Sequence, residues 1–159
     1  MTAQSPETTI SADPATPTIR ISREFDAPAA KVFRAHTDPE LVRQWLGPRR
    51  LRMTIDRWDC VTGGGYRYQH ADENGTYGFY GSFHEVRPDE RIVQTFTFDG
   101  YPDGVSLETL TLTELDGGRC RLDILSVVDT FEVRDMILSS GMEVGVNEGY
   151  EQLDELLAR

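Results

Sequence analysis

Residues 66–98 read YRYQHADENGTYGFYGSFHEVRPDERIVQTFTF, and this stretch decides the fold. Aromatic and β-branched residues recur in it between polar ones, which is typical of half-buried β-strands. Two turn signals interrupt the pattern. Asn74-Gly75 suits a type I′ hairpin, and the proline of Arg87-Pro88-Asp89-Glu90 presets φ at the second position of a turn. The stretch therefore predicts two successive antiparallel hairpins.

Both turns predict the same face of the sheet for the aromatic side chains. Directly opposite residues of paired strands share a face, so the loop length fixes which side chains meet. The predicted pairs are Tyr66 with Phe83, Tyr68 with Gly81, His70 with Phe79, Phe79 with Phe98, Gly81 with Phe96, and Phe83 with Gln94. Two turns interpreted independently thus place one set of rings together.

A third hairpin follows around Asp116-Gly117-Gly118. A two-residue Gly-Gly loop sets Leu112 against the charged Asp123, whereas a three-residue loop pairs Leu112 with Leu122 and supplies a glycine for the left-handed position. The three-residue loop is therefore predicted. The same parity turns Glu108 and Ser126 inward.

The strand pattern runs from Leu51 to Val128, and other elements flank it. Thr18–Phe25 alternates as a first strand, and short helices are predicted after Pro28 and from Asp38-Pro39 to Gly47-Pro48. A long helix is predicted over 141–157, with glycine at every fourth position near its start. The predicted fold class is α+β, with a curved antiparallel sheet of about seven strands around the C-terminal helix.

Composition and length limit the possible classes of protein. The 159 residues suit a single domain over 18–159, and the proline-rich, aperiodic residues 1–17 predict a disordered tail. A net charge of -11 opposes binding to nucleic acid or anionic membranes. Two cysteines, Cys60 and Cys120, no secretory signal and no long apolar segment favour a cytoplasmic protein. The sequence does not indicate an oligomeric state.

The inward face and the C-terminal helix supply the candidate site. Apolar walls with a few polar groups describe a pocket for a small molecule. An ordinary filled core is the better explanation of any single ring, and the pocket is favoured only by the set as a whole. The candidate ligand-binding residues are Trp45, Tyr66, Tyr68, His70, Phe79, Phe83, Gln94, Phe96, Phe98, Glu108, Met142, Val146 and Tyr150.

Catalytic and cofactor chemistry have little support in the sequence. Glu108 is a weak candidate for a general acid or base, or for binding a ligand amine or hydroxyl, because burial among apolar residues raises a carboxyl pKa. A solvated Glu108 is the alternative. The three histidines have no metal-ligand spacing, and Gly63-Gly64-Gly65 precedes a strand where a phosphate loop needs a helix. Neither a metal nor a cofactor is expected.

Several short motifs occur in a characteristic order along the chain. They are Arg23-Glu24-Phe25-Asp26-Ala27-Pro28 with Val32-Phe33, Thr37-Asp38-Pro39 through Trp45 to Gly47-Pro48, Gly64-Gly65-Tyr66-Arg67, Gly81 through Glu85-Val86 to Pro88 and Glu90-Arg91-Ile92, and finally Gly141, Gly145, Leu153 and Leu156. Together they resemble the SRPBCC (START-related, helix-grip) superfamily, within it the group similar to the activator of the heat-shock chaperone ATPase.

The resemblance implies a deep pocket between the sheet and the last helix. Related members include carriers of hydrophobic ligands, aromatase and cyclase-like enzymes, and a co-chaperone domain. The group commonly has an aromatic residue where this chain has Val146, which implies a larger pocket. Three functions follow as hypotheses: binding of a small hydrophobic or aromatic molecule, a cyclase or hydrolase using Glu108, and binding to a chaperone.

Overall fold

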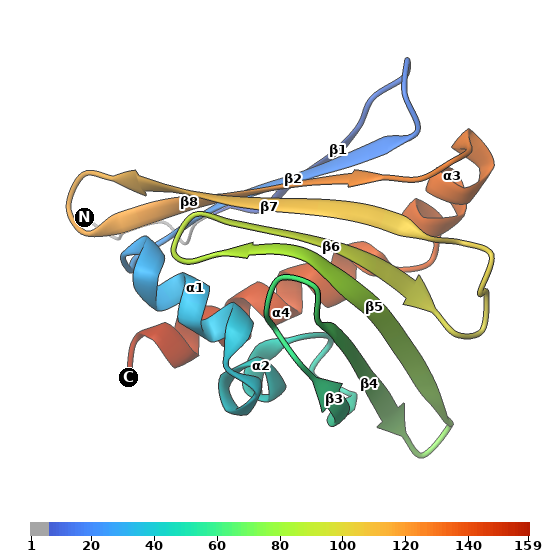
Figure 1. The fold of residues 1–159 in the computed structure, drawn as a ribbon, viewed down its shortest axis with the longest axis horizontal. Coiled ribbons are helices and arrows are strands. Elements are labelled where there is room, and N and C mark those ends of the chain that lie inside the picture. The colour runs from blue at the N-terminus through green and yellow to red at the C-terminus, as the bar shows by residue number, and fades with distance from the viewer. Residues whose placement is uncertain (1–6) are drawn as a thin grey trace.

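One antiparallel sheet of eight strands forms the body of the protein, in the order β1-β2-β8-β7-β6-β5-β4-β3 (Figure 1). The computed structural model describes residues 7–159. The strands are β1 (Thr9–Ala12), β2 (Thr18–Phe25), β3 (Arg52–Trp58), β4 (Gly65–Asp72), β5 (Gly75–Arg87), β6 (Arg91–Phe98), β7 (Ser106–Leu115) and β8 (Arg119–Val127). The α+β prediction is confirmed, with β1 as an additional strand at the edge.

Four helices accompany the sheet, and their ends follow the local sequence. They are α1 (Ala29–Thr37), α2 (Pro39–Trp45), α3 (Phe131–Ser139) and α4 (Met142–Leu157). At the start of α2 the Asp38 carboxylate accepts a hydrogen bond from the amide of Glu40 at 3.0 Å. Gly47, with φ of 96°, follows the end of α2 in the left-handed region. Both short helices therefore lie where the sequence predicts them.

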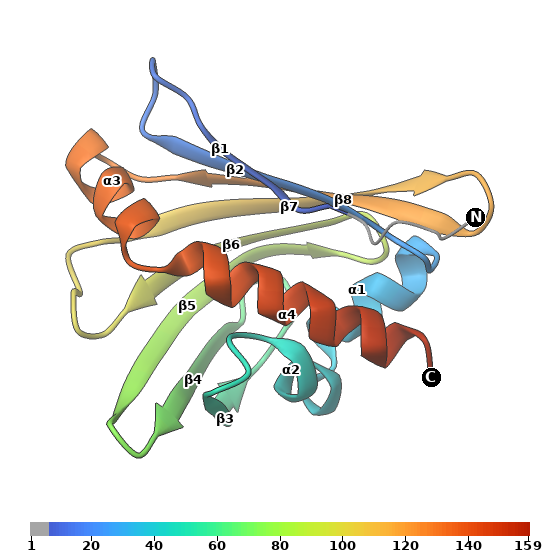
Figure 2. The ribbon, with the colours of Figure 1, turned by 180° about the vertical axis from the view of Figure 1, so that it is seen from behind.

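Helix α4 crosses the concave side of the curved sheet and packs on α2 (Figure 2). Gly149 makes this approach close, because a Cβ atom there would lie 3.3 Å from the carbonyl oxygen of Trp45. The amide of Gln152 also donates a hydrogen bond to the carbonyl of Gly47 at 2.9 Å. The core beneath the helix is tightest at its C-terminal half, where the fully buried side chains are Phe25, Val32, Val42, Cys120, Leu122 and Leu153.

The first hairpin differs in register from its prediction. Its turn is Glu73-Asn74, so Tyr68 faces Phe79, His70 faces Tyr77 and Tyr66 faces Gly81. The carboxylate of Asp72 accepts a hydrogen bond from the Asn74 amide at 2.9 Å, which stabilises this turn without positive φ. The shift is two residues, so every side chain keeps its predicted face.

The other hairpins follow their predicted registers more closely. Phe79 pairs with Phe98 and Phe83 with Gln94, but a bulge follows Phe83. The bulge turns Glu85 away from the face that Phe83 occupies, and the Glu85 carboxylate forms ion pairs with the arginines at positions 87 and 91. The three-residue loop over 116–118 is confirmed, since Leu112 pairs with Leu122 and Glu108 with Ser126.

Two segments were not expected to be ordered in this way. Residues 9–12 of the predicted tail form β1, which pairs with residues 19–22 of β2, so disorder is the wrong interpretation for them. The part of that prediction covering residues 1–6 lies outside the described residues. Helix α3 was not predicted either, although Thr130 caps it by accepting a hydrogen bond from the amide of Val133 at 3.1 Å. Within the described range, no helix is both long and apolar enough to cross a membrane.

Candidate functional site

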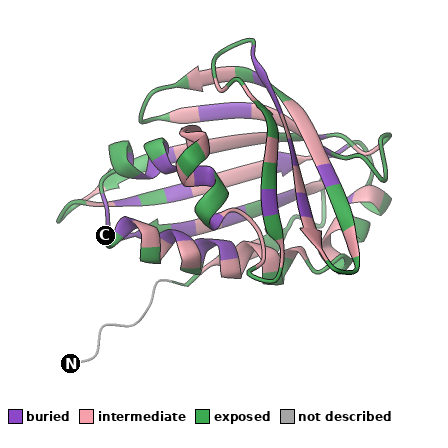
Figure 3. Ribbon diagram, turned by 90° about the horizontal axis from the view of Figure 1, so that it is seen from below, coloured by how far each residue is buried: buried purple, intermediate pink, exposed green. Residues whose placement is uncertain are grey.

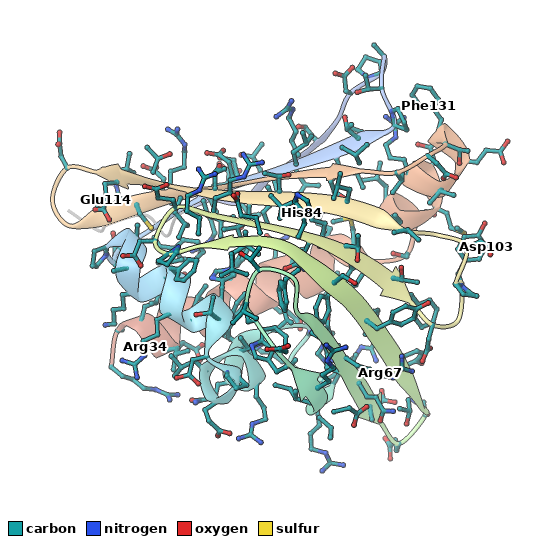
Figure 4. The ribbon with its side chains drawn as sticks, in the orientation of Figure 1. Arg34, Arg67, His84, Asp103, Glu114 and Phe131 are labelled. Carbon is teal, nitrogen blue, oxygen red and sulfur yellow. The ribbon has the colours of Figure 1, made fainter. Side chains whose placement is uncertain are left out.

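The concave face has one tightly packed end and one open end. Figure 4 shows Glu114 at one tip of the sheet and Phe131 and Asp103 near the opposite tip, where α3 and the β6–β7 loop lie. Toward Glu114 the core side chains are fully buried. Toward α3 the inward apolar side chains are half-buried. Figure 3 shows how buried and exposed residues are distributed along the ribbon. We call this second region the open end; its half-buried residues are Phe79, Gln94, Phe96, Glu108, Leu110, Ile124, Met142 and Val146.

A polar cluster lies within this apolar surface. Neighbouring strands β6 and β7 place Gln94 directly beside Glu108, and the Gln94 amide lies 3.4 Å from a carboxylate oxygen of Glu108. The same amide lies 3.3 Å from the hydroxyl of Tyr66, which itself donates to the carbonyl of Thr95 at 2.6 Å. Tyr66 reaches this carbonyl across Gly81, where a side chain would block it. The cluster is thus anchored on three strands.

Two further tyrosines, Tyr68 and Tyr150, lie close enough to Glu108 to be affected by its charge. Tyr68 of β4 and Tyr150 of α4 are both buried, yet among the described residues neither hydroxyl has a hydrogen-bond partner. Burial, and secondarily the charge of Glu108, raises the pKa of both phenols. Both hydroxyls also retain some accessibility, because neither is among the fully enclosed unpaired atoms.

Glu108 has the most unusual electrostatics of the site. Burial raises the pKa of its carboxyl from 4.5 to about 7, and the hydrogen bond from Gln94 opposes this only partly. The guanidinium of Arg23, on the concave side of β2, is engaged elsewhere, with two bonds of 2.8 and 2.6 Å to Asp154. Glu108 therefore lacks a cationic partner among the described residues and is close to half-ionised at neutral pH.

Aromatic rings form a continuous wall beside this carboxyl. Tyr66 stacks on Tyr68 with ring centroids 6.0 Å apart, Tyr68 on Phe79 at 5.4 Å, and Phe79 on Phe96 at 5.3 Å. The wall follows from the parity of the two hairpins, which places all four residues on one face. Two of its rings, Phe79 and Phe96, are half-buried, whereas Tyr66 and Tyr68 are buried.

His70, one of the candidate ligand-binding residues, lies in the packed interior. It is buried beneath Gly47, where a Cβ atom would come within 2.6 Å of its ring. Its ring packs against Tyr68 and Phe79 at 5.3 and 5.7 Å, and burial lowers its pKa. This placement suits a neutral packing residue.

The remaining predicted residues divide between the two ends. Trp45 lies in the packed core, where its indole N–H donates to the carbonyl of Ala35 at 2.8 Å and its ring stacks on Tyr150. Phe83 is also buried in the core. Phe98 is exposed at the rim beside Phe79. Contact of these residues with a ligand stays a prediction.

Sequence reasoning missed two contributions to the site. Arg23 was not among the candidates, although its parity with Ile19 and Ile21 places it on the inward face. Ile137 and Leu138 of α3 pack at the open end as partly buried residues. The helix could have been found from the Thr130 cap and the apolar spacing that follows it.

Two surface hollows are present, and none of the half-buried residues of the open end lines either of them. One, of about 630 Å³, is lined mainly by charged side chains of α4 with Arg23 and Arg49, and the other, of about 470 Å³, lies around Tyr80 and Thr97. A deep enclosed cavity between the sheet and α4 therefore stays a prediction. Within residues 7–159, no three His, Cys, Asp or Glu side chains gather in a way that could hold a metal ion.

A curved antiparallel sheet closed by a C-terminal helix, with two short helices after β2, defines the helix-grip class of proteins, as the resemblance indicated. Within that class, the chain belongs to the family described as Activator of Hsp90 ATPase homolog 1-like protein, whose model matches residues 26–158. No curated protein sequence matches the chain.

Solved structures from several bacteria share this fold. A protein from Rhodobacter sphaeroides is 30% identical, with a TM-score of 0.84 over 94% of this chain and 97% of its own. A protein from Mycobacterium smegmatis is 26% identical, with a TM-score of 0.85 over 95% and 97%. A protein from Arthrobacter aurescens is 25% identical, with a TM-score of 0.85 over 94% and 91%. The fold thus extends over nearly the whole of each chain.

Proposed function

We propose that the protein binds a small hydrophobic or aromatic molecule at the open end, between the sheet and the N-terminal half of α4. The observation that carries the proposal is the partial exposure of apolar side chains there: Phe79, Phe96, Met142 and Val146 are half-buried, whereas the core side chains at the other end of the same face are fully buried. An apolar guest would cover this surface, and burying it would stabilise the complex.

The polar cluster supports the same proposal. Buried polar groups in proteins are generally hydrogen-bonded, so the unpartnered hydroxyls of Tyr68 and Tyr150 and the weakly bonded carboxyl of Glu108 provide sites for a polar group of the guest. Apolar walls would give affinity and these groups would give orientation. The free thiols of Cys60 and Cys120 fit a cytoplasmic location, which belongs to the proposal.

The experiment fills the open end with a larger side chain. Val146→Trp places an indole beside the half-buried surface, while Val144→Trp, two residues earlier on the exposed side of α4, is the matched control. Titration with the neutral fluorophore N-phenyl-1-naphthylamine should saturate at one site in the parent protein and in Val144→Trp. Val146→Trp should weaken binding by about tenfold or more, since its ring occupies the guest's volume. Equal binding by both variants, or no saturable binding to the parent protein, would overturn the proposal.

An acid–base enzyme is the second candidate, favoured by one observation. A carboxyl whose pKa is raised to about 7 is suited to both accepting and donating a proton near neutral pH. The reaction would then need Glu108 itself, so Glu108→Gln should abolish turnover of a polyketide-like test substrate while the circular dichroism spectrum is retained. Unchanged turnover in this variant would remove Glu108 from that role.

A further inference from the structure

The open end contains the carboxyl group of Glu108, but no positively charged side chain is available to pair with it among the described residues. The guanidinium of Arg23 is held by Asp154 through two hydrogen bonds, and burial keeps the imidazole of His70 uncharged. Glu108 lies opposite Gln94 and Ser126 in the sheet, and Gln94 is its sole hydrogen-bonding partner among the described residues. The site therefore has a carboxylate that no positively charged side chain neutralises among the described residues.

The aromatic rings beside Glu108 also favour a positively charged guest. Tyr68, Phe79 and Phe96 form a stacked wall, and aromatic faces attract cations through their quadrupole. The unpartnered hydroxyls of Tyr68 and Tyr150 can each accept a hydrogen bond from an N–H group. A neutral alcohol would leave the buried carboxylate uncompensated, whereas an ammonium group would pair with it.

We propose that the guest at the open end is an apolar or aromatic amine, whose ammonium group contacts Glu108 and the hydroxyls of Tyr68 and Tyr150. This inference rests on the proposed binding function and names its ligand class. The amine body lies along the ring wall and the half-buried side chains of α4, and the charged end lies between β7 and α4.

Proton linkage follows from the groups that face Glu108. They are Gln94 on β6, Ser126 on β8, Tyr66 and Tyr68 on β4, and Tyr150 on α4. None of these carries a positive charge. An arriving cation stabilises the ionised carboxyl, so amine binding near pH 7 releases up to roughly half a proton per molecule bound. A guest that instead accepts a hydrogen bond from the neutral carboxyl causes proton uptake.

The test compares two probes of nearly the same size and shape, 1-naphthylmethylamine and 1-naphthylmethanol. Calorimetric titrations at pH 8 should show the amine binding about tenfold tighter than the alcohol, and this preference should shrink at pH 6 as Glu108 is protonated. Titrations at pH 7 in two buffers of different ionisation enthalpy should show proton release with the amine.

Two variants separate a specific contact from general attraction to an acidic protein. Glu108→Gln should bind both probes equally, while Asp123→Asn, which removes an exposed carboxylate from the outward face of the same hairpin, should keep the preference. Equal binding of amine and alcohol to the parent protein, or a preference that survives Glu108→Gln, would overturn the amine inference and leave the binding function standing. Failure of both probes to bind would overturn the binding function itself.

Discussion

Replacing Glu108 by glutamine should make the protein more stable as the pH rises. Glutamine has nearly the same shape as glutamate and keeps contact with Gln94, but it carries no charge to bury. The carboxylate of the parent protein ionises in a position where burial disfavours the charge. The substitution therefore removes the cost of burying a carboxylate that has no cationic partner among the described residues.

The sign and size of the effect follow from the carboxyl pKa. It is about 7 in the folded protein against an ordinary value of 4.5, so the folded protein binds more protons than the unfolded chain between these values. Stability therefore falls as the pH rises through this window, by about 3 kcal/mol in total at 1.36 kcal/mol for each tenfold change in proton affinity. Because pH 5 already lies inside the window, the stability gap between the variant and the parent should widen by about 2–3 kcal/mol from pH 5 to pH 8.

Urea unfolding at pH 5 and pH 8 measures this gap directly. At pH 8 the variant should also melt roughly 6–12 °C above the parent protein, given about 2–4 °C per kcal/mol at this chain length. Asp123→Asn is the control, since its carboxylate is exposed beside Arg121 and should give a gap that hardly changes with pH. A Glu108→Gln protein that is less stable than the parent at pH 8, or a gap independent of pH, would refute the reasoning.

Further substitutions test the packing and the charges of the fold. Gly47→Ala should lower the unfolding free energy by about 2 kcal/mol, because φ is 96° and the new Cβ would meet a buried imidazole. Gly145→Ala should raise the unfolding free energy by about 0.5–1 kcal/mol through helix propensity, and the reverse order of stability would contradict this explanation. Asp154→Asn should cost about 3 kcal/mol, because it leaves the Arg23 guanidinium buried without its carboxylate, and adding Arg23→Met should recover part of the loss in a double-mutant cycle. Burial lowers the pKa of His36 to about 4, so its contribution to stability is present above pH 6.5 and is lost as the pH falls toward 4. His36→Phe should therefore flatten the loss of stability between pH 6.5 and 4 in an acid titration followed by circular dichroism. An unchanged slope over this range would contradict the prediction.

Much of the architecture could be predicted from local chemistry. The Asp38-Pro39 start and Gly47-Pro48 end of α2, the strand Thr18–Phe25 and the three-residue loop after Leu115 are all where the turn and capping residues place them. Face assignment proved more robust than register. The first hairpin slipped by two residues, yet a period of two keeps each side chain on its face.

Predictions from the local sequence failed for the features that depend on distant parts of the chain. Strand β1 exists because β2 offers it an edge, which the composition of residues 9–12 does not reveal. The bulge after Phe83 moved Glu85 outward, since one extra residue reverses the parity of everything beyond it. His70 became a buried packing residue because the loop at Gly47 folds over it.

The sequence by itself determined the class of sheet, the set of rings on its inner face and the inward direction of Glu108, because turns and a period of two are local properties. Only the tertiary structure decided that one end of that face is packed solid and the other left open, and that Tyr150 of α4 joins Tyr68 and Gln94 around the carboxyl. The burial of a side chain and the pairing of its charge depend on contacts with segments that are distant in the chain. No local pattern contains them.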